Sequence, residues 1–252
     1  MLKLYEFGPS RSIRARWTLQ EIGVPFESVP VNLRTSEHRT EAFLRINPAG
    51  KVPVLIDGDV VLTESVAIAL YLADKFPEAR LSPTDLVGRG RVQQWCLFAA
   101  TEMEQPLWRI AKHRRFYPKN QRIPADIPLA GEDFVTAVRV LDGHMRDRSF
   151  VAADMFTVAD IVVAYTLDWA NELDLLDGMS ALGAYMERMY QRPNAAAHRC
   201  RARGSASLNG GDGRCRRAHR TRQPQRRRSE QKPIAPMRAQ PVGQFRQIPH
   251  LA

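Results

Sequence analysis

The chain has 252 residues, enough for one large domain or two small ones. Its net charge of +10 is unevenly placed. Residues 198–252 hold 14 Lys and Arg against 2 Asp and Glu, whereas residues 1–197 hold 23 against 25. The larger part is therefore nearly neutral, and its composition gives no electrostatic footprint for nucleic acid.

Strands and helices alternate in the predicted structure of the first third. In chain order the expected elements are a strand at 2–7, a helix at 12–22, a strand at 26–32, a short helix or turn at 36–45, strands at 53–57 and 60–63, and a helix at 65–76. Asp57-Gly58 between the last two strands is a strong hairpin signal. This order predicts a mixed sheet with helices.

Helical patterns replace the strand signal after a predicted linker at 77–85. They cover roughly 85–113, 128–148, 157–173 and 180–191. Within them, Thr157 and Asp160 have the spacing of a capping box, and Phe156 and Ile161 flank it as a hydrophobic staple. The pattern predicts an all-helical second half.

Cysteine usage and hydropathy indicate the compartment. Cys96 is the single cysteine of residues 1–197, so no disulfide framework is possible there, and its apolar surroundings predict a core residue. The chain starts as a strand without a signal sequence, and no apolar run approaches the length of a membrane span. We expect a soluble, cytoplasmic protein with no membrane partner.

Residues 47–65 carry the clearest sign of a binding site. Pro53 opens a strand-like run, and if the Val52-Pro53 bond is cis, the Val52 backbone faces outward, free to pair with a peptide-like ligand. Glu64-Ser65 falls where the pattern turns from strand to helix, at a helix N-terminus with free amide donors. These parts suit an amino-acid-like or short-peptide ligand.

Several separated motifs resemble one known family in the same order. They are the first strand Leu2–Tyr5, the helix entry Ser10–Trp17, the route into the second strand Gly23–Glu27, the segment Gly50–Leu55 with Glu64-Ser65, and the cap Phe156–Ile161. Over roughly residues 1–195 the chain resembles the cytosolic glutathione transferases, of a serine type found in bacteria. The resemblance implies a thioredoxin-like α/β domain at 1–80 and an all-helical domain at 86–195.

Thiol activation is the chemistry that the resemblance implies. Free glutathione has a thiol pKa of about 8.5, and a hydroxyl donor together with a helix N-terminus can stabilise the thiolate. Ser10 best matches the thiol-facing position, while Ser12 is either a second catalytic candidate or a helix cap. Tyr5 is a rival that falls early, inside the first strand. Arg11 and Arg14 could assist electrostatically, but arginines on a first helix turn are more often solvated, and we expect them to be so.

The resemblance also assigns the ligand-binding residues. Val52, beside Pro53, binds the cysteinyl backbone of glutathione. Glu64 takes the γ-glutamyl ammonium, and the Ser65 hydroxyl takes the carboxylate together with the helix amides. The remaining candidates, for the glycyl carboxylate, are Lys51 and His38. A histidine in such a position is as often an exposed polar residue.

An apolar electrophile is the expected second substrate, held against the first long helix of the second half. Trp108 and Tyr117 are chosen for its pocket, while most other aromatic residues there are expected in the core. We expect a detoxifying transferase that conjugates glutathione, works as a homodimer and uses no metal. The alternatives are a glutathione-dependent isomerase, reductase or dehalogenase, and a non-catalytic binding or stress protein; a reductase would favour a cysteine in place of Ser10.

Residues 198–252 lack the pattern of a folded protein. They are rich in Arg, Gln, Pro and Gly, and their apolar residues follow no period. The prediction is a basic, disordered tail without a specific role. An out-of-frame origin and nucleic-acid or membrane binding are alternatives, and nucleic acid is disfavoured because only Phe245 could stack on a base.

Overall fold

The structure is a computed structural model that describes residues 1–196. All of these residues belong to one compact unit. The expectations for the basic segment at 198–252 lie outside the described residues. The division into domains at 1–80 and 86–195 stays a prediction.

The first half contains a four-stranded mixed sheet, as predicted. Its strands are β1 (Leu2–Glu6), β2 (Phe26–Pro30), β3 (Val54–Asp57) and β4 (Val60–Thr63). The spatial order is β2-β1-β3-β4, with β1 parallel to β2 and antiparallel to β3. This places the start of β3 beside the end of β1, where Val54 is the register partner of Tyr5.

The hairpin turn lies one residue later than Asp57-Gly58. Asp57 still pairs with Val60, and the two loop residues are Gly58 and Asp59. Gly58 has a φ of +59°, a left-handed conformation that glycine adopts without strain. The dipeptide signal therefore found the hairpin and missed only its centre.

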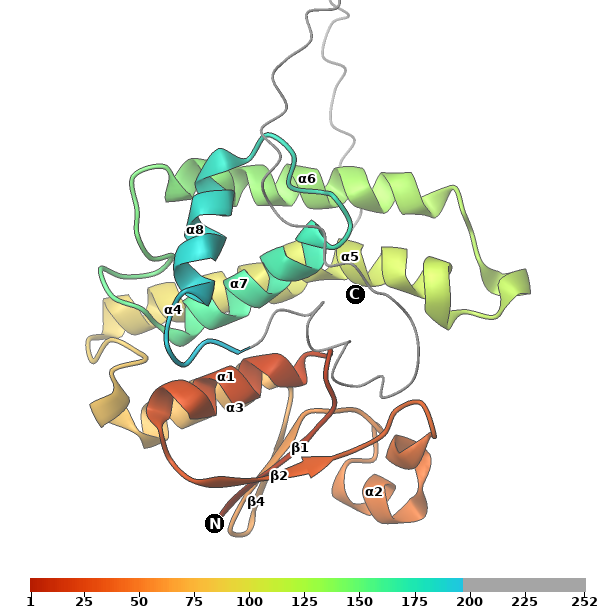
Figure 1. Ribbon diagram of the computed structural model, residues 1–252, viewed down its shortest axis with the longest axis vertical. Helices are drawn as coiled ribbons and strands as arrows, with labels where there is room; N and C mark the ends of the chain where they lie inside the picture. Colours follow the sequence, from red (N-terminus) through yellow and green to blue (C-terminus); the bar gives the residue numbers. More distant parts are fainter. Residues whose placement is uncertain (197–252) are drawn as a thin grey trace, which may run out of the picture. The chain divides into compact units, whose positions relative to one another are not determined.

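Helices cover both faces of the sheet (Figure 1). Two of them, α1 (Ser12–Ile22) and α3 (Ser65–Lys75), lie together on one face, where Leu4 packs in their core. On the other face Phe43 of α2 (Glu41–Ile46) shares a small core with Val54 and Tyr5. Tyr5 and Phe43 pack edge to face, with 6.1 Å between ring centroids. Tyr5, the alternative candidate for the thiol donor, thus points away from α1.

The second half is entirely helical among the described residues. Its elements, with the short turns that precede and join them, are η2 (Pro77–Ala79), α4 (Leu86–Phe98), η3 (Ala99–Met103), α5 (Glu104–Ala111), η4 (Lys112–Phe116), η5 (Lys119–Gln121), α6 (Asp126–Met145), α7 (Val158–Asn171) and α8 (Ser180–Tyr190). No helix of residues 1–196 has the length and apolarity that crossing a bilayer requires.

The predicted helix at 85–113 is interrupted by two π-helical segments, η3 and η4. Pro106 follows η3 by three residues, and its ring lacks an N–H and would clash with a carbonyl one turn earlier. Widening the preceding turn relieves that clash. Glu104, the first residue of α5, follows this turn and lies inside the protein with 3% of its surface exposed.

The largest apolar core joins the two halves. It contains most of α7 and also Trp17 of α1 and Ala69 of α3. The helix face that does not cover the sheet therefore packs against the helical half. This arrangement fixes the N-termini of α1 and α3, where the candidate site lies.

Candidate functional site

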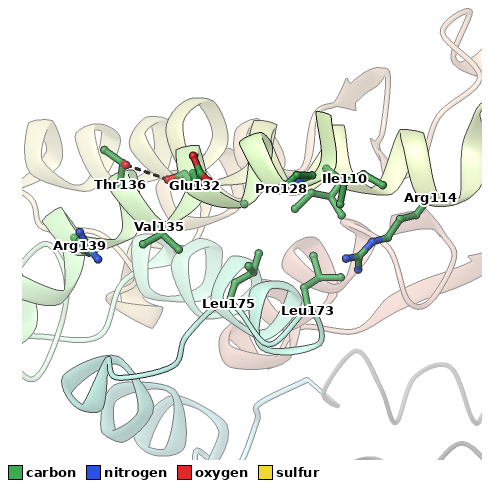
Figure 2. A pocket seen from close by; sticks show the side chains of 11 residues that line it. Ile110, Arg114, Pro128, Glu132, Val135, Thr136, Arg139, Leu173 and Leu175 are labelled. Atoms are coloured by element: carbon green, nitrogen blue, oxygen red, sulfur yellow. Dashed lines mark hydrogen bonds between the residues drawn. The ribbon is translucent and has the colours of Figure 1, made fainter. Parts of the chain in front are cut away.

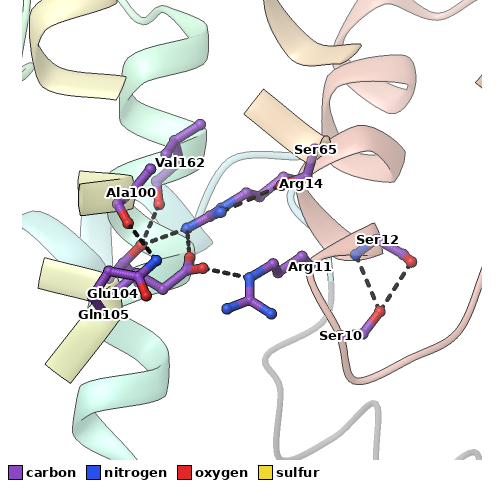
Figure 3. A network of polar contacts seen from close by, with 10 residues as sticks. Ser10, Arg11, Ser12, Arg14, Ser65, Ala100, Glu104, Gln105 and Val162 are labelled. Atoms are coloured by element: carbon purple, nitrogen blue, oxygen red, sulfur yellow. Dashed lines mark hydrogen bonds and ion pairs between the residues drawn. The ribbon is translucent and has the colours of Figure 1, made fainter. Parts of the chain in front are cut away.

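Ser10 and Ser12 form a small hydroxyl network just before α1. Their hydroxyl oxygens lie 2.9 Å apart (Figure 3). The Ser10 hydroxyl also donates to the Phe7 carbonyl, and the Phe7 N–H donates to Ser12 Oγ at 3.2 Å. Ser10 is half-buried, whereas Ser12 is 1% exposed. Of the two hydroxyls, the Ser10 hydroxyl is the one open to a ligand.

The expectation that Ser12 caps the helix is wrong. Ser12 is the first residue of α1, the cap position belongs to Arg11, and the Arg11 side chain makes no cap hydrogen bond. Instead the Ser10 hydroxyl accepts from the Ser12 N–H at 3.2 Å. Ser10 therefore satisfies one of the free amides of the helix end, and Ser12 supports Ser10 from inside the protein.

The loop before β3 has the predicted backbone. The Val52-Pro53 bond is cis, and Gly8-Pro9, in the loop that follows β1, is cis as well. Pro53 is buried, and Val52 is half-buried and lies two residues before Val54, where the pairing begins. Asn47 steadies this loop, because its side-chain amide donates to the Lys51 carbonyl at 2.8 Å.

Gly50 brings the segment Glu37–Arg39 against the same loop. Its φ is +59°, and an added Cβ would lie 2.9 Å from both the Arg39 guanidinium and the His38 carbonyl. Lys51 is exposed, as a residue that reaches for a carboxylate must be. Arg39, the residue after the predicted candidate His38, is an exposed cation beside this loop.

His38 is better suited to donate a hydrogen bond than to supply charge. Burial, and then the nearby Arg39, hold the pKa of His38 below its usual value, so the ring is neutral at pH 7. Its Nδ1 is buried and has no hydrogen-bond partner within residues 1–196. A neutral histidine with an unused nitrogen fits a polar ligand group better than the exposed histidine considered above.

Glu64 and Ser65 stand at the N-terminus of α3, as predicted. Glu64 is exposed and has a φ of +64°, which is rare for a residue with a side chain. Such backbone strain clusters at ligand sites. Ser65 begins the helix and is 3% exposed. Together they present a carboxylate, a hydroxyl and free backbone amides at one helix end.

The expectation of solvated arginines on α1 is wrong. Arg14 is 1% exposed, and its guanidinium pairs with the buried Glu104 and donates to Ser65 Oγ at 3.3 Å. Arg11 pairs with the other oxygen of Glu104 (Figure 3). In the sequence alone, such residues have the pattern of a polar helix face, because their partner stands some 90 positions later in the chain.

Arg11 connects Trp108 to the start of α1, because the arginine side chain packs on the tryptophan ring. The Arg11 guanidinium stands 5.1 Å from the Trp108 ring and 5.6 Å from that of Trp169. Phe116 also packs on Trp108, with 4.9 Å between ring centroids, and is largely exposed. Trp169 was missed because it follows a buried helix pattern that gives no sign of a nearby site.

None of the contacts described for Tyr117 involves Ser10. Its ring packs on His113 at 5.1 Å and near the Lys112 ammonium. Its carbonyl accepts from Arg122 at 2.8 Å. These partners all belong to the turn that joins α5 to α6.

A cavity of about 570 Å³ lies between α6 and the segment after α7 (Figure 2). Leu173 and Leu175 face Val135 across it, and Arg114 reaches in from one end. None of the predicted site residues lines this cavity. The candidate site is therefore defined by convergent polar groups at two helix ends rather than by the cavity.

Potential metal ligands and the one described cysteine complete the survey of reactive groups in residues 1–196. No group of three or more potential metal ligands occurs in this part of the chain. Cys96 is fully buried, as expected, and burial raises its pKa to about 12. Its thiol is therefore protonated at neutral pH and does not serve as a nucleophile.

Comparison with known proteins gives consistent results. Residues 1–74 match the family model described as glutathione S-transferase, N-terminal domain, and residues 121–188 match its C-terminal counterpart. Glutathione S-transferase F9 of Arabidopsis thaliana is 33% identical, over 64% of this chain and 77% of that protein. Glutathione S-transferase theta-1 of Rattus norvegicus is also 33% identical, over 75% and 82%. A solved glutathione S-transferase from Xylella fastidiosa has a TM-score of 0.68 at 27% identity, covering 77% of this chain and 95% of that one.

The sheet, the cis-proline loop and the helical half define a thioredoxin-like protein with an appended helical part. The predicted site residues Ser10, Glu64 and Ser65 lie at the N-termini of α1 and α3. With two family models matched and relatives above 30% identity over most of their length, the chain belongs to the glutathione S-transferase family. It is thus a transferase with glutathione as co-substrate, and the serine type stays a prediction.

Proposed function

We propose that this protein conjugates the glutathione thiolate to a hydrophobic electrophile. The observation that carries the proposal is the accessible Ser10 hydroxyl at the start of α1, supported from behind by the buried Ser12. Because only the thiolate is a good nucleophile, the enzyme must lower the thiol pKa. A shift of about two units requires about 2.7 kcal/mol of differential stabilisation.

Ser10 is the thiol donor in this proposal, and Ser12 is its positioning residue. If Ser12 donates to Ser10 Oγ, the Ser10 proton is left to point outward, to the Phe7 carbonyl in the free protein and to the ligand sulfur in the complex. A hydrogen bond to a charged acceptor contributes about 1.5–3 kcal/mol. The positive end of the α1 dipole adds to it.

The rest of glutathione lies between the two helix ends. Val52 pairs with the cysteinyl backbone beside Pro53, where the loop has not yet joined the sheet. Glu64 accepts the γ-glutamyl ammonium, while Ser65 and the α3 amides hold the carboxylate. The glycyl carboxylate is taken by Lys51, with His38 donating a hydrogen bond.

The electrophile lies against the aromatic group of Trp108, Trp169 and Phe116. Trp108 and Trp169 flank Arg11, the residue next to Ser10, so an apolar substrate there meets the sulfur directly. Tyr117 is retained as a more distant contact from the turn after α5. Catalysis then comes from thiolate stabilisation and from holding the two reactants together.

Kinetics with 1-chloro-2,4-dinitrobenzene, a generic aromatic halide, tests the assignment. We expect Ser10→Ala to lower kcat/KM by about 100-fold and to raise the pKa of the pH–rate profile, because the thiolate loses its donor. Ser12→Ala should lower kcat/KM by about tenfold, since Ser10 remains but is less well oriented. Unchanged turnover in Ser10→Ala would reject the catalytic role.

A matched control is Ser149→Ala, an exposed serine between α6 and α7 that holds none of the proposed contacts. It should keep both kcat and the pH–rate profile. Retention on immobilised glutathione without turnover of any electrophile would instead support the non-catalytic binding protein.

The same proposal includes the setting of the enzyme. The first half, residues 1–80, binds glutathione and the second, 86–195, binds the electrophile. Cys96 as the single cysteine of residues 1–197 fits a reducing cytoplasm. A homodimer is supported by Leu86 and Leu97, which lie three turns apart on α4 and are 86% and 60% exposed.

A further inference from the structure

Arg14 connects the two halves of the protein at the end of α3. Its guanidinium donates to Glu104 at the start of α5, to Thr166 Oγ1 of α7 at 2.7 Å and to Ser65 Oγ at 3.3 Å. The ring of Tyr165 lies 4.6 Å from the same guanidinium. Three of these four partners belong to the helical half, and the fourth is a predicted ligand residue.

The position of this guanidinium is set from the helical side. Arg14 and Glu104 are 1% and 3% exposed, so neither can swing out to water. Glu104 also pairs with Arg11, and Thr166 Oγ1 donates to the Val162 carbonyl of its own helix at 2.9 Å. A planar fork held at several points has little freedom left.

The bond to Ser65 fixes where the serine proton goes. Because Arg14 has no acceptor, it donates to Ser65 Oγ, and the hydroxyl proton must point elsewhere. The Ser65 proton is then available to an anion at the α3 N-terminus. Arg11, Arg14 and Glu104 together carry one net positive charge, which favours the same anion.

We propose that Arg14 is a positioning residue for the co-substrate: held by Glu104 and Thr166, it aims the Ser65 hydroxyl at the γ-glutamyl carboxylate. The helical half thereby sets the affinity of the other half for glutathione. This inference rests on the proposed function for the binding pose at Ser65. It adds a residue that makes no contact with the ligand itself.

Arg14→Lys is the decisive variant, because lysine keeps the charge but cannot hold three partners with one planar group. We expect KM for glutathione to rise about tenfold, the loss of roughly one charge-assisted hydrogen bond, with kcat at saturation within about twofold. The Kd for glutathione, measured by calorimetry, should rise by the same factor.

A modified ligand distinguishes the proposed positioning of the Ser65 hydroxyl from a general loosening of the contact between the two halves. In 4-aminobutyryl-cysteinyl-glycine the γ-glutamyl ammonium remains and only the carboxylate is missing. If Arg14 acts through that carboxylate, wild type and Arg14→Lys should bind this analogue with Kd values within about twofold. An equal loss for both ligands would overturn the proposal.

Arg192→Lys is the matched control. Arg192 also joins α1 to the helical half, through two 2.8 Å bonds to Glu21, whose side chain is as buried as that of Glu104. Its pair stands at the opposite end of α1 from Ser65. KM for glutathione should stay within about twofold of wild type. A rise equal to that of Arg14→Lys would mean that any loosened contact between the halves has this effect.

Thr166→Val is the second variant if Arg14→Lys does not fold. It removes one anchor of the guanidinium and no ligand contact, so KM should rise about threefold with kcat unchanged. Unchanged KM would count against the proposal. Wild type that binds glutathione but turns over no electrophile would sink the proposed function, while the binding measurements would still decide the role of Arg14.

Discussion

Glu104 shows how a single buried carboxyl group ties stability to pH. Burial pushes its pKa upward, but Arg14 and then Arg11 outweigh that effect, and the pKa lies below its usual value of 4.5. A carboxyl group with a lowered folded-state pKa stabilises the protein above the unfolded-state pKa. That contribution is lost as the pH falls through the folded-state value.

Glu104→Gln should therefore destabilise the protein by about 3 kcal/mol at pH 7, because two arginines lose their charged partner. The difference from wild type should shrink as the pH falls below about 4.5, where the unfolded chain takes up a proton, and should disappear once the pH has fallen through the lower pKa of folded Glu104. Urea unfolding of wild type and Glu104→Gln at pH 7 and at pH 3 measures this difference in stability.

Glu41→Gln is the control, since Glu41 pairs with Arg45 on an exposed helix face and its loss should matter little at either pH. A Glu104→Gln effect that is the same at pH 7 and pH 3 would contradict the assignment of a charged Glu104.

At the scale of elements, the cap of α7 does more than start a helix. Thr157 donates its N–H to Asp160 Oδ2 at 2.9 Å, which is the predicted capping box. Asp160 Oδ1 also accepts from the Val151 N–H at 2.9 Å and from the Tyr185 hydroxyl at 2.8 Å. One fully buried side chain thus joins α7, the loop before it and α8.

We expect Asp160→Ala to cost about 3 kcal/mol or more, because buried donors on three segments lose their acceptor. Asp85→Ala removes an exposed cap bond to Gly88 on α4 and should cost about 1 kcal/mol. Thermal and urea unfolding compare the two. If Asp160→Ala does not fold, Tyr185→Phe should cost about 1 kcal/mol. Equal costs for the two aspartate variants would reduce Asp160 to an ordinary cap.

Local signals explain why the elements were predictable. Gly23 ends α1 with a φ of +78°, the Asp-Gly signal marks the β3–β4 hairpin, and Thr157 with Asp160 marks α7. Each acts within a few residues, so the sequence contains it. The π-helical turn before Pro106 was not predicted, because it depends on how the proline fits the surrounding core.

The candidate site was predictable only in its local parts. Ser10, Val52 and Glu64-Ser65 stand at element boundaries that the sequence marks. Arg14 was expected to be solvated and Trp169 was missed, because their partners are distant in the chain. Whether an arginine is buried depends on a carboxylate that folding brings to it, and periodicity carries no information about that.

For the whole molecule, the exposed apolar surface bears on assembly. Val60 and Val61 on the edge strand β4 are 42% and 47% exposed, and Leu86 and Leu97 are exposed on α4. Leu97→Glu should convert the proposed homodimer into monomers, because a charge would be buried at the contact. Light scattering after size-exclusion chromatography measures the mass.

Leu129→Glu on α6 is the matched control, a leucine of similar exposure at 54% on another helix. It should leave the mass of the assembly unchanged. Dissociation by Leu129→Glu and not by Leu97→Glu would move the interface to α6, and a monomeric wild type would remove the dimer altogether.

The burial of Cys96 bears on whether the electrophilic substrates of the proposed reaction can alkylate the protein itself. Alkylating agents attack any accessible sulfur that carries a negative charge. Within residues 1–196 the protein's own sulfhydryl stays sealed and protonated, with a pKa of about 12. In the proposed mechanism, a reagent arriving beside Ser10 therefore finds its target on the bound tripeptide, and the folded catalyst is spared from inactivating itself at Cys96.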